Sequence, residues 1–193
     1  MISVVLLKYQ RPIERVVESL KRWPFVDDVV VWDNSVCNVG LAGRYEAAKN
    51  ARHDTVYVQD DDCIVRNVDV LVERFEREPD RLSNAIKAEH VGWWAEWEGL
   101  LAWGAVFDRK WIGLMRPYID RYGAETMFWQ ADRVFVGALP RPHNTILADI
   151  EEFECAFGPE AVHRQAGYGE QCHEARRRIE AMRAGGESCR QLA

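Results

Sequence analysis

The first 60 residues alternate between short apolar segments and segments with helical spacing, and this order limits the possible folds. Residues 2–7 (ISVVLL), 29–32 (VVVW) and 55–59 (TVYVQ) are rich in β-branched and aromatic residues, as buried strands are. Between the first two, Pro12 stands where a helix can begin, and apolar residues follow at helical spacing: Ile13, Val16, Val17 and Leu20. Strands that alternate with helices predict an α/β, Rossmann-like fold with a mostly parallel central sheet flanked by helices.

The remaining chain contains further segments with a recognisable pattern. In order, they predict a short helix after Gly40, an amphipathic helix over 67–77 that Pro79 ends, a buried strand over 100–107, a helix over 110–122 and a charged helix over about 170–183. No internal repeat or long linker interrupts them.

The composition is that of a globular protein. With 193 residues, 48% of them hydrophobic and 29% charged, the chain is long enough for one domain with a sizeable core. The net charge of −6 argues against a wholly basic nucleic-acid-binding surface, although Arg176, Arg177 and Arg178 form a local basic run.

Two further features bear on the compartment. No apolar run approaches the roughly 20 residues needed to cross a bilayer, and the first residues lack the basic start of a signal peptide. The five cysteines form no C-x-x-C pair, which predicts reduced thiols rather than a zinc site or a disulfide framework. We therefore expect an intracellular, cytoplasmic protein.

The strongest chemical signal is the acidic triplet Asp60-Asp61-Asp62, directly after the third apolar segment. In an open α/β sheet, ligands bind beyond the carboxyl ends of the strands, where this triplet would lie. Three adjacent carboxylates repel one another, and a hard divalent cation that also binds phosphate relieves the repulsion. The alternative is an aspartate-rich turn that only ends a strand.

A second enzyme class also fits the triplet. Asp60-x-Asp62-x-Ile64 approaches the D-x-D-x-(T/V) signature of haloacid-dehalogenase-type phosphatases, in which the first aspartate would be the nucleophile. That signature normally follows the first strand and requires Thr or Val where Ile64 stands, together with a later acidic pair. We find no convincing aspartate pair after residue 80, so the phosphatase is the second hypothesis.

Taken in order, several segments of the chain resemble the exostosin-like glycosyltransferases, which have the GT-A fold. Besides the triplet, the similar segments are 8–12 (KYQRP), 31–35 (VWDNS), 38–45 (NVGLAGRY), 78–82 (EPDRL), 101–107 (LAWGAVF) and 130–135 (QADRVF). Tyr45 stands where the family pattern has Phe, and Ala131 stands where it has Glu, so that of the usual Glu-Asp pair only Asp132 remains. The resemblance covers residues 2–140.

The resemblance implies a UDP-linked sugar donor and a divalent cation, Mn²⁺ or Mg²⁺. Asp62 would hold the cation, with Asp60 reaching the ribose or a metal-bound water, and Arg44 would assist the leaving diphosphate. The implied donor-side residues are Lys8, Arg11, Asp33, Asn34, Arg44, Asp60 and Asp61. Arg11 and Arg44 are also ordinary candidates for ion pairs, and Asp33 for a turn cap.

Further candidates come from later in the chain. Asp132 would orient the acceptor hydroxyl or act as a base, or else cap a helix over Val134 and Phe135. His143 is a candidate late metal ligand, although a loop histidine is more often plain surface. Trp93, Trp94 and Trp97 could stack on a sugar or nucleobase, and we expect one of them to do so.

The resemblance divides the chain into parts but leaves the acceptor open. We expect a catalytic domain over 1–150, with a donor half at about 1–85 and an acceptor half at about 86–150, and a helical extension over 151–193. The acceptor would be a glycan, a small molecule or, as one concrete possibility, a hydroxymethylated pyrimidine of phage DNA, with the arginine-rich tail following phosphates. A non-catalytic carbohydrate- or nucleotide-binding module is the third hypothesis.

Overall fold

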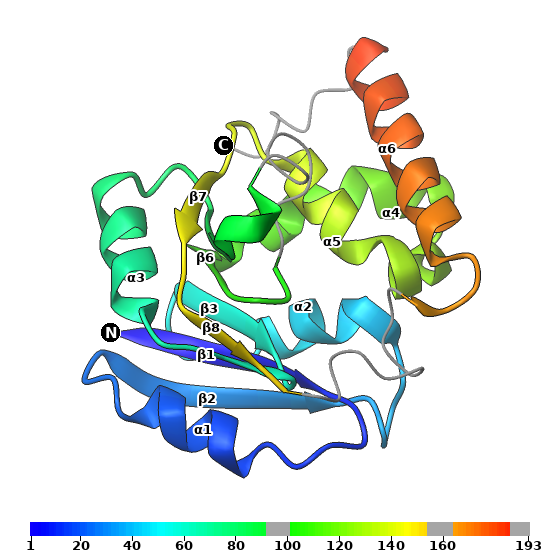
Figure 1. Cartoon of the computed structure of the whole chain (residues 1–193). Helices are drawn as coiled ribbons and strands as arrows, with labels where there is room; N and C mark the ends of the chain where they lie inside the picture. The colour runs from blue at the N-terminus through cyan, green and yellow to red at the C-terminus, as the bar shows by residue number, and fades with distance from the viewer. Residues whose placement is uncertain (92–100, 154–163, 186–193) are drawn as a thin grey trace.

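The structure of the chain is a computed structural model that describes residues 1–91, 101–153 and 164–185. Its centre is a six-stranded sheet with helices on both sides (Figure 1). In spatial order the strands are β2 (Val26–Asp33), β1 (Ile2–Lys8), β3 (Thr55–Asp60), β6 (Ala105–Asp108), β5 (Ser83–Ile86) and β7 (Asn144–Leu147). β6 runs antiparallel to β3 and β5, and the other neighbouring pairs are parallel. The predicted mostly parallel α/β sheet is confirmed.

The central strands are apolar because helices cover both of their faces. Val4, Val5 and Leu6 of β1 and Val56 and Val58 of β3 are fully buried. Strands buried on both faces read as continuous apolar runs rather than as alternating patterns. The same runs that predicted the strands therefore also form the core.

The helices follow the predicted spacing where that spacing was clear. In α1 (Glu14–Lys21), Val16 and Leu20 are buried, and in α3 (Val68–Arg77) the four apolar positions of the predicted stripe are buried. The other helices are α2 (Gly43–Ala48), α4 (Arg116–Tyr122), α5 (Met127–Ala138) and α6 (Tyr168–Ala184). In Figure 1, α1 lies on one side of β1–β3, and α2, α5 and α6 lie on the other. In the described parts of the chain, no helix is long and apolar enough to cross a membrane.

A second, two-stranded sheet lies beside the acidic triplet. β4 (Cys63–Val65) pairs antiparallel with β8 (Ile150–Glu152), so the segment just after residue 149 returns to the turn that follows β3. The backbone N–H of Phe153 donates to the carbonyl of Asp62, at 2.8 Å between N and O. The start of the expected helical extension therefore contacts the triplet, and α6 follows later against α5.

Some elements differ from their prediction. The strand expected over 100–107 is confined to β6, because the chain turns at Gly104, whose φ of +124° favours glycine. The helix expected over 110–122 is a 3₁₀ helix, η3 (Arg109–Met115), followed by α4. Pro117 stands in the first turn of α4, where its missing N–H costs nothing.

Four strands, β4, β5, β7 and β8, were not predicted. They are only three or four residues long, and they include polar residues such as Ser83, Asn84 and Asn144. Cys37, Cys63 and Cys172 are free thiols, as expected for those three.

Candidate active site

The acidic triplet lies at the carboxyl end of β3, as predicted. Asp60 is the last residue of the strand, and Asp61 and Asp62 form the turn into β4. The buried side chain of Gln59 fixes this turn by donating from Nε2 to the carbonyl of Cys63, at 2.7 Å. The backbone N–H of Asp60 donates to the carbonyl of Ala102, at 2.8 Å. The two hydrogen bonds, to the carbonyls of Cys63 and Ala102, therefore hold the backbone of the triplet in place.

Arg44 joins Asp60 to Asp132. Its side chain is fully buried, with Nη2 at 2.7 Å from Oδ1 of Asp60 and Nε at 3.4 Å from Oδ1 of Asp132. The hydroxyl of the neighbouring Tyr45 donates to the same Oδ1 of Asp132, at 2.9 Å. Residues 60 and 132, far apart in sequence, thus share one buried cation.

Gly40 is what allows α2 to come so close to α5. It begins η1 (Gly40–Ala42) with a φ of +59°, and a Cβ there would lie 2.2 Å from the carbonyl oxygen of Phe128 in α5. Only glycine fits this approach. The contact brings Arg44, one turn after Gly40, beside Asp132, one turn after Phe128.

The charges in this cluster change the protonation equilibria of its members. Burial works against the charge of Arg44, but Asp132 and Asp60 outweigh it and raise the pKa of the guanidinium. Burial raises the pKa of Asp60 to about 8, although Arg44 opposes the rise, and the charges of Asp62 and Asp132 add to it. Burial also raises the pKa of Asp132, against the effects of Arg44 and Tyr45. Burial is the largest cause of both carboxyl shifts, and the single cation shared by the two groups offsets it only in part.

Arg11 holds the outer part of the triplet. Its Nη1 lies 3.0 Å from Oδ1 of Asp61 and 3.2 Å from Oδ2 of Asp62. Asp61 also accepts the backbone N–H of Tyr9, at 2.8 Å, so the loop after β1 is tied to the loop after β3. The Arg11 side chain is 14% exposed, whereas that of Arg44 is fully buried.

The other predicted donor-side residues lie at the same edge of the sheet. Lys8 and Asp33 end β1 and β2 and form an ion pair of 2.6 Å, with 28% of each side chain exposed. The Lys8 ammonium and the Ser35 hydroxyl lower the pKa of Asp33 to about 2. Asn34 is buried: its Oδ1 accepts from the backbone of Val39 and its Nδ2 donates to the carbonyl of Gly40. Asn34 therefore shapes the loop before η1.

The described part of the site offers few side-chain ligands for a metal ion. Among the described residues, no group of three or more His, Cys, Asp or Glu side chains is arranged to hold one. The Asp62 side chain is 20% exposed and Arg11 contacts its Oδ2, while Oδ1 has no contact within the described ranges. Mg²⁺ commonly binds through one or two carboxylates together with substrate phosphates and water. Asp62 suits a cation shared with a diphosphate, rather than a preformed metal cage.

His143 is not brought to the triplet. It precedes β7, and β7 is parallel to β5, so His143 lies near the amino edge of strands whose carboxyl edge carries Asp60. β7 is also three strand spacings from β3, about 14 Å at roughly 4.8 Å per spacing. A shared cation requires oxygen and nitrogen ligands within about 2–2.6 Å. We therefore drop His143 from the metal site.

Asp132 lies in the middle of α5, so it does not cap that helix. Trp93, Trp94 and Trp97 fall outside the described residues. No sequence pattern points to Tyr45 as a partner of Asp132. Neither does any pattern point to a neighbouring cluster in which Glu152 of β8 accepts from Nε1 of Trp103 at 3.0 Å and pairs with Lys87. The contact of Tyr45 with Asp132 depends on the packing of α2 on α5, and the position of Glu152 depends on the pairing of β8 with β4. Sequence spacing reveals neither.

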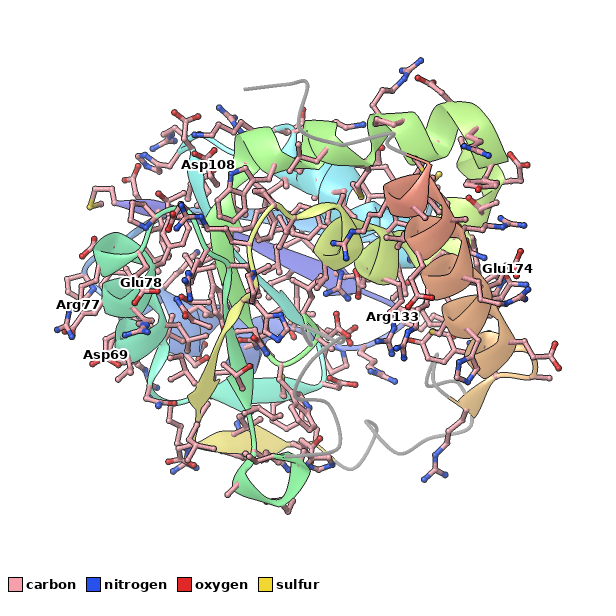
Figure 2. The ribbon with its side chains drawn as sticks, turned by 90° about the horizontal axis from the view of Figure 1, so that it is seen from above. Asp69, Arg77, Glu78, Asp108, Arg133 and Glu174 are labelled. Carbon is pink, nitrogen blue, oxygen red and sulfur yellow. The ribbon has the colours of Figure 1, made fainter. Side chains whose placement is uncertain are left out.

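The basic run near the C-terminus does not form an unpaired basic surface. Arg176 pairs with Glu180 at 3.0 Å, Arg178 pairs with Glu174 at 2.7 Å, and Arg177 also contacts Glu174. Figure 2 shows Glu174 on α6 at one side of the molecule, with Arg77 at the end of α3, and Glu78 just after it, at the other. The charges of this run are largely balanced on α6 itself.

Comparisons with known proteins identify the fold. No family model matches the sequence, and no curated protein matches it. A structure of S. aureus TarS (1–349) with UDP-GlcNAc matches with a TM-score of 0.60 and 13% identity, over 93% of this chain and 65% of that one. Mycobacterium tuberculosis glucosyl-3-phosphoglycerate synthase with Mn²⁺, UDP-glucose and phosphoglyceric acid matches at 0.50 and 14%, over 89% and 79%. A putative glucose-1-phosphate thymidylyltransferase from Bacillus anthracis matches at 0.54 and 10%, over 90% and 99%.

At these identities the likeness concerns the fold. The chain has the fold of GT-A-type nucleotide-sugar glycosyltransferases, and it spans less than two thirds of the TarS fragment. The fold predicted from the sequence is therefore supported, whereas nothing in these matches singles out the exostosin-like family. Two observations weigh against the haloacid-dehalogenase-type phosphatase: Asp60 ends the third strand along the chain, whereas that signature normally follows the first, and its carboxyl group is paired with Arg44.

Proposed function

We propose that the protein is a glycosyltransferase that moves a sugar from a nucleoside diphosphate, UDP in the first instance, to a hydroxyl acceptor. One observation carries the proposal: Asp60 and Asp132, 72 positions apart, meet on buried Arg44 at the carboxyl edge of a GT-A-type sheet. This edge is where open α/β sheets bind ligands. A donor-side and an acceptor-side carboxylate meeting there are suited to a group transfer between two substrates.

On the donor side, Asp62 would hold Mn²⁺ or Mg²⁺ with the diphosphate, with Asp60 nearby. When bound, such a cation offsets negative charge on the leaving diphosphate. Arg11 and Lys8 are partly exposed cations at this edge and would attract the phosphates. Asp33 and Asp61 would contact the nucleoside or order its loop. The related fold of a synthase crystallised with Mn²⁺ and UDP-glucose supports this assignment.

Arg44 receives a different role from the one expected. Because its side chain is fully buried between two carboxylates, it has no exposed group to offer a leaving diphosphate. We propose that Arg44 fixes Asp60 and Asp132 relative to each other. Asp132, 18% exposed, would orient the acceptor hydroxyl and take its proton while that oxygen bonds to the anomeric carbon. The bond from the sugar to the diphosphate breaks, and the diphosphate leaves with its electron pair.

The acceptor is the least constrained part of the proposal. We retain the division into a donor half at about 1–85 and an acceptor half at about 86–150, with a C-terminal extension, and the exostosin-like enzymes as candidate relatives. A hydroxymethylated pyrimidine of DNA is the weaker acceptor candidate, because the arginines of α6 pair with glutamates of the same helix. Such pairing leaves little net positive charge to follow phosphates.

A nucleotidyltransferase is the second candidate function, because a thymidylyltransferase shares the fold over 99% of its length. The two reactions give different products. A glycosyltransferase releases UDP from a UDP-sugar, whereas a nucleotidyltransferase releases pyrophosphate from a nucleoside triphosphate and a sugar phosphate. A non-catalytic module would bind the nucleotide or sugar and release neither.

The test is to titrate UDP calorimetrically in EDTA and in Mn²⁺, and then to measure UDP release from UDP-glucose and UDP-N-acetylglucosamine. We expect tighter UDP binding with Mn²⁺ and slow UDP release even with water as the acceptor. A parallel assay supplies UTP or dTTP with glucose 1-phosphate and measures pyrophosphate. Pyrophosphate without UDP release would favour the nucleotidyltransferase, and metal-independent binding without either product would favour a binding module.

A further inference from the structure

The two oxygens of the Asp132 carboxylate have different surroundings. Oδ1 accepts the hydroxyl of Tyr45 at 2.9 Å and lies 3.4 Å from Nε of Arg44. Oδ2 has no hydrogen bond or ion pair to any residue in the described ranges, and it is not among the buried side-chain atoms there that lack a partner. With 18% of the side chain exposed, Oδ2 is the oxygen open to a substrate.

Tyr45 is built into the fold so that its hydroxyl has one direction. The residue is 2% exposed, and its ring packs on Phe135, one turn after Asp132 in α5, with centroids 5.1 Å apart. Burial and the charge of Asp132 raise the pKa of the phenol well above its ordinary value, so the hydroxyl remains a donor throughout the neutral range. A buried hydroxyl with a single carboxylate partner restricts the rotation of that carboxylate.

We propose that Tyr45 is a positioning residue for sugar transfer, which holds Oδ1 of Asp132 so that Oδ2 faces the acceptor hydroxyl. The proposal rests on the proposed glycosyltransferase function. Tyr45 acts through Asp132 and does not itself touch the substrate. Arg44 supplies charge to the same oxygen, but at 3.4 Å and without hydrogen-bond geometry, so the directional contact comes from Tyr45.

The role of Tyr45 predicts a separation of rate from affinity. Orientation of a reacting group is felt mainly in the transition state, so its loss lowers kcat and leaves the KM for the donor unchanged. Tyr45→Phe removes one oxygen and keeps the ring packing on Phe135. Tyr118→Phe is the matched control: Tyr118 is 3% exposed, and its hydroxyl donates to Gln130 at 2.5 Å and not to Asp132.

The experiment measures kcat and KM for UDP release from a UDP-sugar with Mn²⁺, together with the melting temperature, for both variants. We expect Tyr45→Phe to lower kcat about tenfold or more at unchanged KM, the scale of one lost charge-assisted hydrogen bond. Tyr118→Phe should melt at least as early as Tyr45→Phe and keep wild-type kcat. In an Asp132→Asn background, Tyr45→Phe should lower kcat no further, because both changes remove one function.

A Tyr45→Phe variant with wild-type kcat would overturn the inference and leave the proposed function intact. An equal loss of kcat in Tyr118→Phe would also overturn it, because the effect would then be general loosening. If the wild-type protein neither binds UDP nor releases it from UDP-sugars, the proposed function fails and this inference fails with it. If Tyr45→Phe does not fold, Phe135→Leu is measured instead, because it removes the ring on which Tyr45 packs and keeps the hydroxyl; wild-type kcat in that variant would overturn the inference.

Discussion

Two arginines hold the acidic residues of the candidate site, and their surroundings differ. Arg11 bridges Asp61 and Asp62 near the surface, with 14% of its side chain exposed. Arg44 bridges Asp60 and Asp132 and is fully buried. The same ion-pair chemistry therefore occurs at the rim of the site and inside the protein.

The difference in burial implies a difference in use. An ion pair near water contributes little to the free energy of unfolding, because solvent screens it. Its two groups can therefore exchange partners at a small cost in free energy. A buried pair costs much to break, because the remaining charge is left without a partner. We infer that the Arg11 pairs yield to a nucleotide diphosphate and its cation, whereas the Arg44 pairs persist through the reaction.

The largest expected effect follows from removing each arginine in turn. Arg44→Met leaves two carboxylates without their buried cation and should lower the free energy of unfolding by about 3–5 kcal/mol. Arg11→Met should lower it by less, about 1–3 kcal/mol, because Asp61 is buried but keeps the N–H of Tyr9, and Asp62 is partly exposed. Urea denaturation of both variants measures the difference. Equal losses would mean that the two regions do not differ in the way their burial indicates.

The same two regions show what the sequence could predict. The triplet follows a strand that is apolar throughout, and the carboxyl end of such a strand is a known ligand edge, so the position of Asp60 was predictable. The ion pair of Arg44 with Asp60 was not, because Arg44 looked like any lone arginine in a helix. Only the approach of η1 to α5 at Gly40 makes that arginine buried.

The acceptor half was harder to predict because its elements are short and polar. β5 and β7 each have four residues, and their pairing order follows from a crossover that local spacing does not encode. His143 was assigned to the metal site without knowledge of this order, and the order puts it at the other edge. Asp132 was placed by resemblance alone, and its contact with Tyr45 needed the packing of α2 on α5.

The second prediction separates the two sides of the site through Asp132. Asp132→Asn keeps the size of the side chain but removes its charge and basicity. We expect UDP with Mn²⁺ to bind about as tightly as to the wild type, while sugar transfer falls by roughly 10²-fold or more, as for a lost acid–base or orienting group. Calorimetry and product formation are measured on the same preparation. If the folded variant loses UDP binding, Asp132 belongs to the donor side. If the variant keeps full activity, Asp132 has no role in the transfer.

The third prediction concerns the rim. Asp62→Ala should remove the difference between UDP affinities in Mn²⁺ and in EDTA, because the carboxylate that shares the cation is gone. We expect roughly a tenfold loss of affinity in Mn²⁺, the scale of about 1.4 kcal/mol. Asp80→Ala is the control, since Asp80 is 51% exposed and pairs with Arg141 at 2.6 Å, away from the triplet. A metal effect that survives in Asp62→Ala would assign the cation to other groups.

The smallest expected effect is a dependence of stability on pH that belongs to the interior cluster. The pKa of Asp60 is raised to about 8 by burial and by neighbouring carboxylates. A carboxyl with a higher pKa in the folded than in the unfolded chain binds its proton more tightly when folded. The free energy of unfolding therefore falls as pH rises between the two pKa values and levels off above the upper one. For Asp60 the loss continues up to about pH 8.

Between pH 7 and 8.5, the metal-free wild-type protein should lose about 1 kcal/mol of stability through Asp60. Burial lowers the pKa of His143 from its ordinary value, so the unfolded chain binds that proton more tightly and the contribution of His143 makes stability rise with pH, opposite to the loss through Asp60. His143 is present in wild type and in Asp60→Asn, so its contribution cancels in their difference. The side chain at position 60 cannot titrate in Asp60→Asn, so this variant should lack the loss. The cysteine thiols titrate in both proteins, so subtracting one stability curve from the other removes their contribution. Urea denaturation at several pH values in EDTA measures both proteins. Parallel curves would mean that Asp60 stays ionised beside Arg44 throughout this pH range. The buried pairs of Arg44 would then not differ in protonation from the pairs of Arg11.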